Sequence, residues 1–234
     1  MGKMRAISIW GTAIISMLLL VLTFKYGATD NFPTIITIAL LLVLLISYFY
    51  FEKSSMGTKE IAIIATLSTF AAASRVAFAA LPNIKPTTFL VALSGYVFGP
   101  YEGFLVGSTA AFISNIFMGQ GPWTPWQMFA WGLVGVISGF LGLRNKNISP
   151  EKFAIICFAY GFLFDWIMNL WHVLGFIRPL TFRGIFLAYI SGLTFDILHA
   201  AGNYIFTIIF FEKFLKVLLR FKKRLEITYI KMEG

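Results

Sequence analysis

Charged residues are scarce in this chain. They make up 12% of its 234 residues, whereas an ordinary soluble domain has about 25%. Hydrophobic residues make up 59%. So little charge cannot cover a water-facing surface, which excludes a soluble enzyme domain and a disordered chain. A transmembrane helix needs roughly 20 apolar residues, so the chain has room for at most about eight, which excludes a large two-bundle carrier. The composition predicts a small all-α polytopic membrane protein.

The chain has a single cysteine and no nucleotide-binding motif. The one cysteine, Cys157, lies in an apolar run and permits no intramolecular disulfide. The sequence has no G-x-x-x-x-G-K-[ST] motif, no G-x-G-x-x-G after a strand, no nucleophile elbow and no H-E-x-x-H pair. We therefore expect no cofactor, and any uphill transport must draw its energy from a coupled ion or from another subunit.

Eight hydrophobic segments are predicted to be helices. They cover residues 6–24, 33–51, 60–80, 87–99, 102–118, 127–143, 152–174 and 185–211. The fourth segment is short and breaks at Gly99-Pro100, which is typical of a half-helix. A polar loop from Glu52 to Lys59 separates the first two segments from the rest. We expect an accessory transmembrane hairpin over 1–52 and a six-helix membrane domain with a basic tail over 53–234.

The formal net charge of +9 could indicate binding of nucleic acid or of anionic lipid. If both termini are cytoplasmic, most of the 19 Lys and Arg residues lie in the inner ends and loops. The outer loops then hold only Lys25, Lys85, Arg178 and Arg183. This distribution follows the positive-inside rule. It predicts a multi-pass cell-membrane protein with both termini in the cytoplasm, a tail that contacts lipid headgroups, and no nucleic-acid partner.

Three ionisable residues, Arg75, Asp165 and Asp196, lie inside predicted spans, where burial in hydrocarbon is costly. Spacings of three and four residues place other polar residues on the same helix face as each aspartate. Asp165 shares its face with Asn169 and His172, and Asp196 shares its face with His199 and Asn203. These groups can form interhelical hydrogen bonds, with Arg75 neutralised by an aspartate, or contact a substrate through His172 or Asn169. We assign the three ionisable residues to structural pairing. The two histidines lie at different depths, so we expect no metal site.

Small residues form one row on the third predicted helix. At four-residue spacing they are Ala65, Thr69, Ala73 and Ala77. Such a row lets another helix approach closely, either inside the protein or as a docking surface for a partner subunit.

The outer loops hold tryptophans between prolines and glycines. They form either an interfacial aromatic belt or a preorganised pocket for a planar organic ligand, and we favour the pocket. The candidate substrate-binding residues are Asn83, Lys85, Trp123, Trp126, Gln127, Trp171, His172 and Arg178.

Four segments resemble a known family. They are FAALPNIKPT (78–87), GYVFGPYEGFLVG (95–107), Ser114-Asn115 and FDILHAAGN (195–203), the last followed by the basic tail. Together, over roughly residues 60–225, they resemble the S components of energy-coupling factor (ECF) vitamin transporters. The resemblance implies a six-helix substrate-binding subunit with an outward vitamin pocket. It also implies a complex with a transmembrane scaffold, the T component, and two cytoplasmic ATPases that drive toppling of the loaded subunit.

Within that family the resemblance implies more specific roles. The family's alanine motif, which meets the scaffold, is matched most literally by Ala73 and Ala77, and less literally by Ala65 and Thr69. The Pro-Trp-Thr-Pro-Trp-Gln loop, from Pro122 to Gln127, looks most like the cobalamin subgroup, so the expected substrate is cobalamin or a related corrinoid. Pantothenate or folate is the alternative substrate. An intramembrane enzyme using the Asp and His residues, or an ion-coupled carrier, are the alternative functions.

Overall fold

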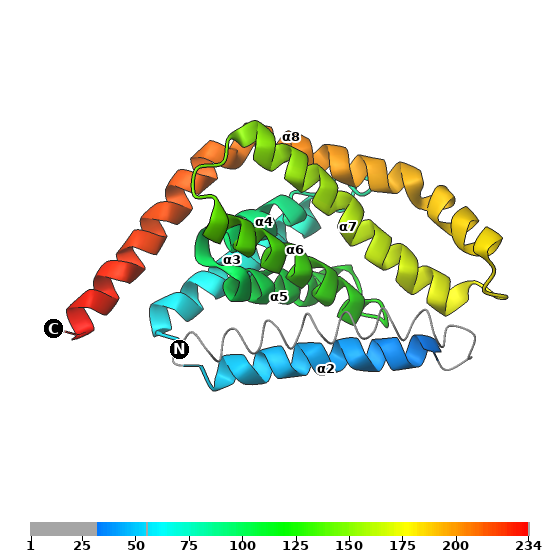
Figure 1. The fold of residues 1–234 in the computed structure, drawn as a ribbon, viewed down its shortest axis with the longest axis horizontal. Helices are drawn as coiled ribbons and strands as arrows, with labels where there is room; N and C mark the ends of the chain where they lie inside the picture. Colours follow the sequence, from blue (N-terminus) through cyan, green and yellow to red (C-terminus); the bar gives the residue numbers. More distant parts are fainter. Residues whose placement is uncertain (1–31, 55, 234) are drawn as a thin grey trace.

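A computed structural model of the chain describes residues 32–54 and 56–233 (Figure 1). This part of the chain is built from helices: α2 (Phe32–Glu52), α3 (Thr58–Ala77), α4 (Thr87–Phe98), α5 (Pro100–Met118), α6 (Thr124–Arg144), α7 (Pro150–Phe176) and α8 (Phe182–Glu233). They match the last seven predicted segments. The first predicted span, 6–24, lies outside the described residues. Within the described part, α2, α3, α6, α7 and α8 are long and apolar enough to cross a membrane, which confirms the prediction of an all-α polytopic membrane protein.

Helix α4 is a half-helix, as predicted. Its 12 residues span about 18 Å at 1.5 Å per residue, well short of a hydrocarbon core of roughly 30 Å. The chain ends α4 at Gly99, whose φ of 125° favours glycine, and Pro100 then opens α5. Every residue of α4 from Thr87 to Val97 is buried. Helix α4 is therefore an internal element that the spanning helices surround.

Glycines allow α4, α5 and α6 to meet backbone to backbone. A Cβ atom built on Gly95 of α4 would lie 2.1 Å from the carbonyl oxygen of Gly135 on α6. A Cβ atom on Gly135 would lie 2.1 Å from the carbonyl oxygen of Gly103 on α5. No other residue type fits at such separations, so these positions fix how closely the three helices pack.

Helix α2 packs against the later helices. Its residues Ile36, Leu40 and Val43 share a buried apolar cluster with Trp126 and Phe129 of α6 and Leu174 of α7. The Tyr48 hydroxyl also lies 2.9 Å from the Ser108 hydroxyl of α5. The described half of the predicted leading hairpin thus shares a core with the six-helix domain.

Helix α8 is much longer than the predicted span 185–211. Its 52 residues extend about 78 Å, so it outruns any bilayer core. Its first half runs antiparallel beside α7 (Figure 1). Its second half turns away from α7 toward the C-terminus and still contacts the end of α4 through Lys222. The exposed basic residues Lys213, Lys216 and Arg220 lie on this second half, so the start of the predicted basic tail is a continuation of the helix.

Candidate functional site

A first polar network surrounds Arg75, near the C-terminal end of α3. The Arg75 side chain is 6% exposed. One terminal nitrogen, Nη1, donates to Ser114 Oγ at 2.7 Å and to Asn115 Oδ1, both on α5. The other, Nη2, donates to Gln127 Oε1 on α6 at 3.3 Å. The guanidinium carbon also lies 4.9 Å from the centre of the Trp131 ring, a separation at which the ring face attracts a cation.

Arg75 therefore joins α3, α5 and α6 through neutral groups. Asn115 Nδ2 closes the network by donating to Gln127 Oε1 at 2.8 Å and to Thr124 Oγ1 at 3.0 Å. Among the described residues neither aspartate contacts Arg75, so the expected neutralisation of Arg75 by an aspartate does not occur. Within the same residues, Arg75 Nε is buried without a hydrogen-bond partner.

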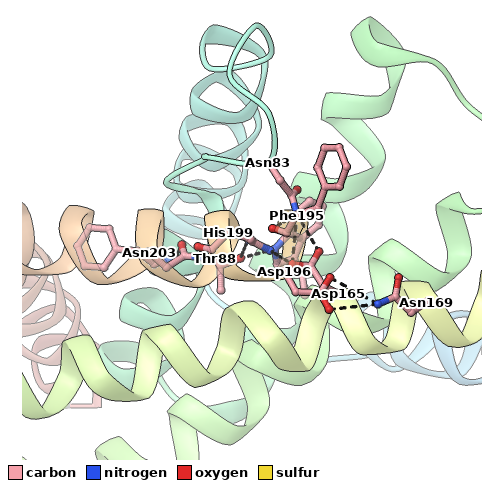
Figure 2. A network of polar contacts seen from close by, with 10 residues as sticks. Asn83, Thr88, Asp165, Asn169, Phe195, Asp196, His199 and Asn203 are labelled. Carbon is pink, nitrogen blue, oxygen red and sulfur yellow. Dashed lines mark hydrogen bonds and ion pairs between the residues drawn. The ribbon is translucent and has the colours of Figure 1, made fainter. Parts of the chain in front are cut away.

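A second polar network connects α4, α6, α7 and α8 (Figure 2). Trp131 Nε1 donates to Thr88 Oγ1 at 2.9 Å. Thr88 Oγ1 lies 2.9 Å from His199 Nε2, and His199 Nδ1 lies 2.9 Å from Asp165 Oδ2. Trp131 can only donate, so the Thr88 hydroxyl accepts from it and directs its own hydrogen toward His199 Nε2. This assigns the ring proton of His199 to Nδ1, which donates to the Asp165 carboxylate.

Asn83 attaches the loop between α3 and α4 to this network. Its Nδ2 donates to both carboxylate oxygens of Asp165 at 3.2 Å and to the Phe195 carbonyl oxygen at 3.0 Å. Asn83 has a φ of 56°, a left-handed conformation that asparagine tolerates better than most residues. The loop is thus held against α7 and α8, and Asn83 acts here as a structural connector (Figure 2).

Asp196 is hydrogen-bonded to Asn169 and not to the residues around Asp165. Asn169 Nδ2 donates to its two oxygens at 3.4 and 3.2 Å. Asp165 and Asp196 thus each bond across α7 and α8, to histidine and asparagine in place of arginine, and their assignment to a structural role stays a prediction.

The hydrogen bonds link Thr88 to His199 and His199 to Asp165, as in a hydroxyl–histidine–carboxylate catalytic triad. Thr88 is 0% exposed and His199 is 2% exposed. A nucleophile must reach its substrate, and a hydroxyl buried to this degree does not. The arrangement holds four helices together.

The eight predicted substrate residues do not gather in one place. Gln127 belongs to the Arg75 network, and Lys85 is near enough to both networks for the charges of Arg75 and Asp165 to act on it. Burial lowers the pKa of the Lys85 ammonium, the Arg75 charge lowers it further, and the Asp165 carboxylate opposes both effects. Asn83 belongs to the second network.

Two of the other candidates form an aromatic contact. The ring centres of Trp123 and Trp171 are 6.1 Å apart, with the rings edge to face. The exposed His172 ring stacks on Phe176 at 5.4 Å. Trp123 and Gln127 are four residues apart at the start of α6, so this aromatic pair lies one helical turn from the Arg75 network.

The last two candidates have local partners. Trp126 is 2% exposed and donates from Nε1 to Thr37 Oγ1 of α2 at 3.2 Å. Arg178 is exposed, and its Nη1 donates to the carbonyl oxygens of Leu174 and Ile177 at the end of α7. Trp126 is thus part of the packing against α2, and Arg178 caps a helix end.

Neither Thr88 nor Trp131 is among the residues predicted from the sequence. A periodicity signal exists for Trp131, because Trp123, Gln127 and Trp131 recur every four residues on one face of α6. Thr88 carries no such signal: it stands in an apolar helix whose residues are all buried from Thr87 to Val97.

The row of small residues faces outward. Ala65, Thr69, Ala73 and Ala77 are all exposed. Beside the last two lies an apolar groove of about 430 Å³ between α3, α4 and α8. Its aromatic lining residues are Phe70, Phe78, Phe89, Phe206, Phe210 and Phe214.

Comparison with known proteins places the chain in a family. The family model described as "ECF-type riboflavin transporter, S component" matches residues 55–216, more than half of the chain. The chain belongs to this family. S components are transport subunits, so the prediction that this chain is not an enzyme is confirmed and the intramembrane-enzyme alternative is wrong.

Curated relatives of this S component match over shorter stretches. A UPF0397 protein of Vibrio atlanticus is 36% identical over 65 residues, which cover 28% of this chain and 35% of the relative. A UPF0397 protein of Clostridium perfringens is 36% identical over 73 residues, covering 31% and 38% respectively. The matches thus cover just over a third of the length of these relatives. No solved structure matches the chain. The resemblance to ECF S components is confirmed, whereas the assignment to the cobalamin subgroup has no support in these matches.

Proposed function

We propose that this protein is the substrate-binding subunit of an ECF-type vitamin importer and that its substrate is a planar heteroaromatic vitamin of the flavin class. The observation that carries the proposal is the family match over residues 55–216, which includes both polar networks. A flavin is proposed in place of the cobalamin expected from the sequence, because the matching family is the riboflavin type.

The chemistry of the outer ends of the helices supports a flavin. A flavin ring is flat, with carbonyl and imide groups at one end and an apolar edge at the other. Trp123 and Trp171 offer aromatic faces for such a ring. The half-buried Gln127, one helical turn from Trp123, and the half-buried Lys85 of the α3–α4 loop offer polar groups to its carbonyl end. We propose these four residues as substrate contacts, with His172 and Arg178 at the exposed rim.

Titration of the purified protein tests the proposal. Riboflavin should bind saturably at one site, and its fluorescence should fall because tryptophan rings quench a stacked flavin. Replacement of Trp123 by alanine should weaken binding about tenfold or more, since a buried stacking contact contributes on the order of 1–3 kcal/mol. Trp126→Phe is the matched control, because Trp126 is buried against α2, and it should leave the affinity within about twofold.

A panel of flavin mononucleotide, cobalamin, pantothenate and folate completes this experiment. Binding of cobalamin alone would overturn the flavin assignment and leave the transport function intact. If the folded protein binds none of these vitamins, the proposed function is wrong.

We further propose that the exposed row Ala65, Thr69, Ala73 and Ala77 docks the T component, which also binds two cytoplasmic ATPases. Exposure of the whole row on α3 favours docking over internal packing, and the adjoining phenylalanine groove offers apolar surface to a partner helix. Ala73→Trp or Ala77→Trp should prevent co-purification of the ATPases from the native host and leave riboflavin binding unchanged.

A matched control is Ala201→Trp, which adds the same side chain to a hollow of about 410 Å³ between α7 and α8. It should leave the complex intact. Co-purification of the ATPases with the Ala73 and Ala77 variants would refute the docking assignment. Uptake in cells that lack the ATPases would instead favour an ion-coupled carrier.

The proposed orientation places both termini in the cytoplasm. The exposed basic residues Arg144, Lys146 and Lys152 support it, because they lie at the end of α6, in the connection that follows and at the start of α7, at the end of the bundle toward which the second half of α8 runs. A cysteine at Lys146 should react with an impermeant reagent only after the membrane is opened, since Cys157 is buried. Labelling in intact cells would reverse the orientation.

A further inference from the structure

A pocket of about 470 Å³ lies at the opposite end of the bundle from the proposed vitamin site, where α4, α6 and α8 come together. We name it the basic pocket. It is lined by Tyr96, Val97, Phe98, Gly99, Gly139, Gly142, Leu143, Lys146, Leu215, Leu219, Lys222 and Lys223. Three of these residues are lysines and none is acidic.

The lysines of the basic pocket come from two separate parts of the chain. Lys146 lies in the connection between α6 and α7, whereas Lys222 and Lys223 lie on α8. Lys222 Nζ donates to the Val97 carbonyl oxygen at the end of α4, at 2.6 Å. An ammonium group has three donors, so Lys222 keeps two for a ligand. Positive charge from both sides of one hollow fits an anion better than a single basic helix face does.

The remaining wall of the basic pocket is apolar and partly exposed at the surface of the bundle. Leu143 is 64% exposed and Leu219 is 48% exposed. A ligand here therefore meets cations at one end and exposed leucines at the other. A free inorganic anion would use only the lysines, whereas a phospholipid would place its phosphate between the lysines and its acyl chains along the leucines.

We propose that the basic pocket binds the headgroup phosphate of an anionic phospholipid of the leaflet at this end of the bundle. The site is distinct from the vitamin site and does not depend on which vitamin is bound. It would hold the end of α4 and the second half of α8 together through a lipid bridge between Lys146 and the lysine pair of α8.

Native mass spectrometry of the full-length protein, released from vesicles of phosphatidylcholine with one quarter phosphatidylglycerol, tests this proposal. The protein should retain one phosphatidylglycerol in preference to phosphatidylcholine. The double variant Lys222→Gln with Lys223→Gln should reduce that preference roughly tenfold, because each lysine near an anionic surface contributes on the order of tenfold or less in affinity. Lys146→Gln, on a different element, should reduce it several-fold.

The matched control is Lys213→Gln with Lys216→Gln. These two lysines are exposed on the same helix and outside the pocket, and the change in net charge is the same. The control should retain the preference. An equal loss in the control would show that only the total charge of α8 matters, which would overturn the site. Displacement of the lipid by 10 mM inorganic phosphate or glycerol phosphate would show that the pocket takes a free anion, which would overturn the lipid assignment.

Discussion

Asp165 is the acceptor on which the second polar network depends. It accepts one hydrogen bond from His199 Nδ1 and shares one N–H of Asn83 Nδ2 between its two oxygens, and it is 7% exposed. Asp165→Asn keeps the size of the side chain and replaces one oxygen with an NH2 group. That NH2 group must face a donor on His199 or on Asn83, whichever way the amide turns.

The cost can be estimated from these bonds. Hydrogen bonds to a charged group contribute about 1.5–3 kcal/mol each, and a buried donor left without a partner costs about 1–3 kcal/mol. Asparagine retains one acceptor, so we expect a net destabilisation of about 2–4 kcal/mol. For a chain of this length that corresponds to a decrease in Tm of roughly 4–16 °C.

Thermal unfolding in detergent, followed by the loss of the monodisperse peak in size-exclusion chromatography, measures this effect. Asp196→Asn is the matched control, because Asp196 is also buried, at 2% exposed, but accepts from Asn169 rather than from His199 and Asn83. The remaining oxygen of the new asparagine can still accept that bond, so the Tm should change by only a few degrees. If Asp165→Asn leaves the Tm unchanged, or if the control costs as much, the proposed bonding of Asp165 is wrong.

Three further substitutions test the packing and the first network. Gly135→Ala places a Cβ atom 2.1 Å from the Gly103 carbonyl oxygen, and it should abolish monodisperse protein, because the backbones of α5 and α6 cannot separate without losing their contact. Trp126→Phe removes the bond to Thr37 and should lower stability by about 1 kcal/mol, seen as a small decrease in Tm. Arg75→Lys replaces a planar fork with a single ammonium group and should lower stability by about 1–3 kcal/mol, measured in the same way.

Each of these predictions has an outcome that contradicts it. A well-folded Gly135→Ala protein would show that the helices can move apart at little cost. Gly175→Ala is its control, since a Cβ atom there meets no atom within 4 Å. Loss of riboflavin binding in the Trp126→Phe variant would show that Trp126 contacts the substrate. An Arg75→Lys variant with wild-type Tm would show that the forked hydrogen bonds contribute nothing to stability.

The helices could be predicted from the sequence because each one is an apolar run. The half-helix could be predicted as well, since Gly99-Pro100 breaks the run for local conformational reasons. The row from Ala65 to Ala77 could be predicted as one face of a helix, because spacing alone decides which residues share a face. Spacing does not say whether that face is inside or outside, and only the structure shows it exposed.

The partners of the polar residues could not be predicted in the same way. They depend on which helices become neighbours, and apolar periodicity carries no such information. Thr88 and His199, for example, are 111 residues apart in the chain and 2.9 Å apart in space. The length of α8 was also missed, because its charged second half has no apolar run although its residues continue the helix.

A buried arginine without a carboxylate needs negative potential from other sources, and the structure supplies three. Oxygens of Ser114, Asn115 and Gln127 accept its hydrogen bonds, and the Trp131 ring lies against its guanidinium. Arg75 is also in the last turn of α3, where the helix dipole favours a cation.

Because Arg75 is stabilised without a carboxylate, Asp165 is available as the acceptor of the second network. A double-mutant cycle of Arg75→Lys and Asp165→Asn tests this by measuring the coupling energy between the two residues. An ion pair between the two residues would give a coupling energy of several kcal/mol. In the structure they share two neighbours: Trp131, whose ring faces one network and whose Nε1 serves the other, and Lys85, whose charge interacts with both residues. The two effects on the free energy of unfolding should therefore add to within about 0.5–1 kcal/mol. A larger coupling would mean that Arg75 and Asp165 interact directly, as the sequence first suggested.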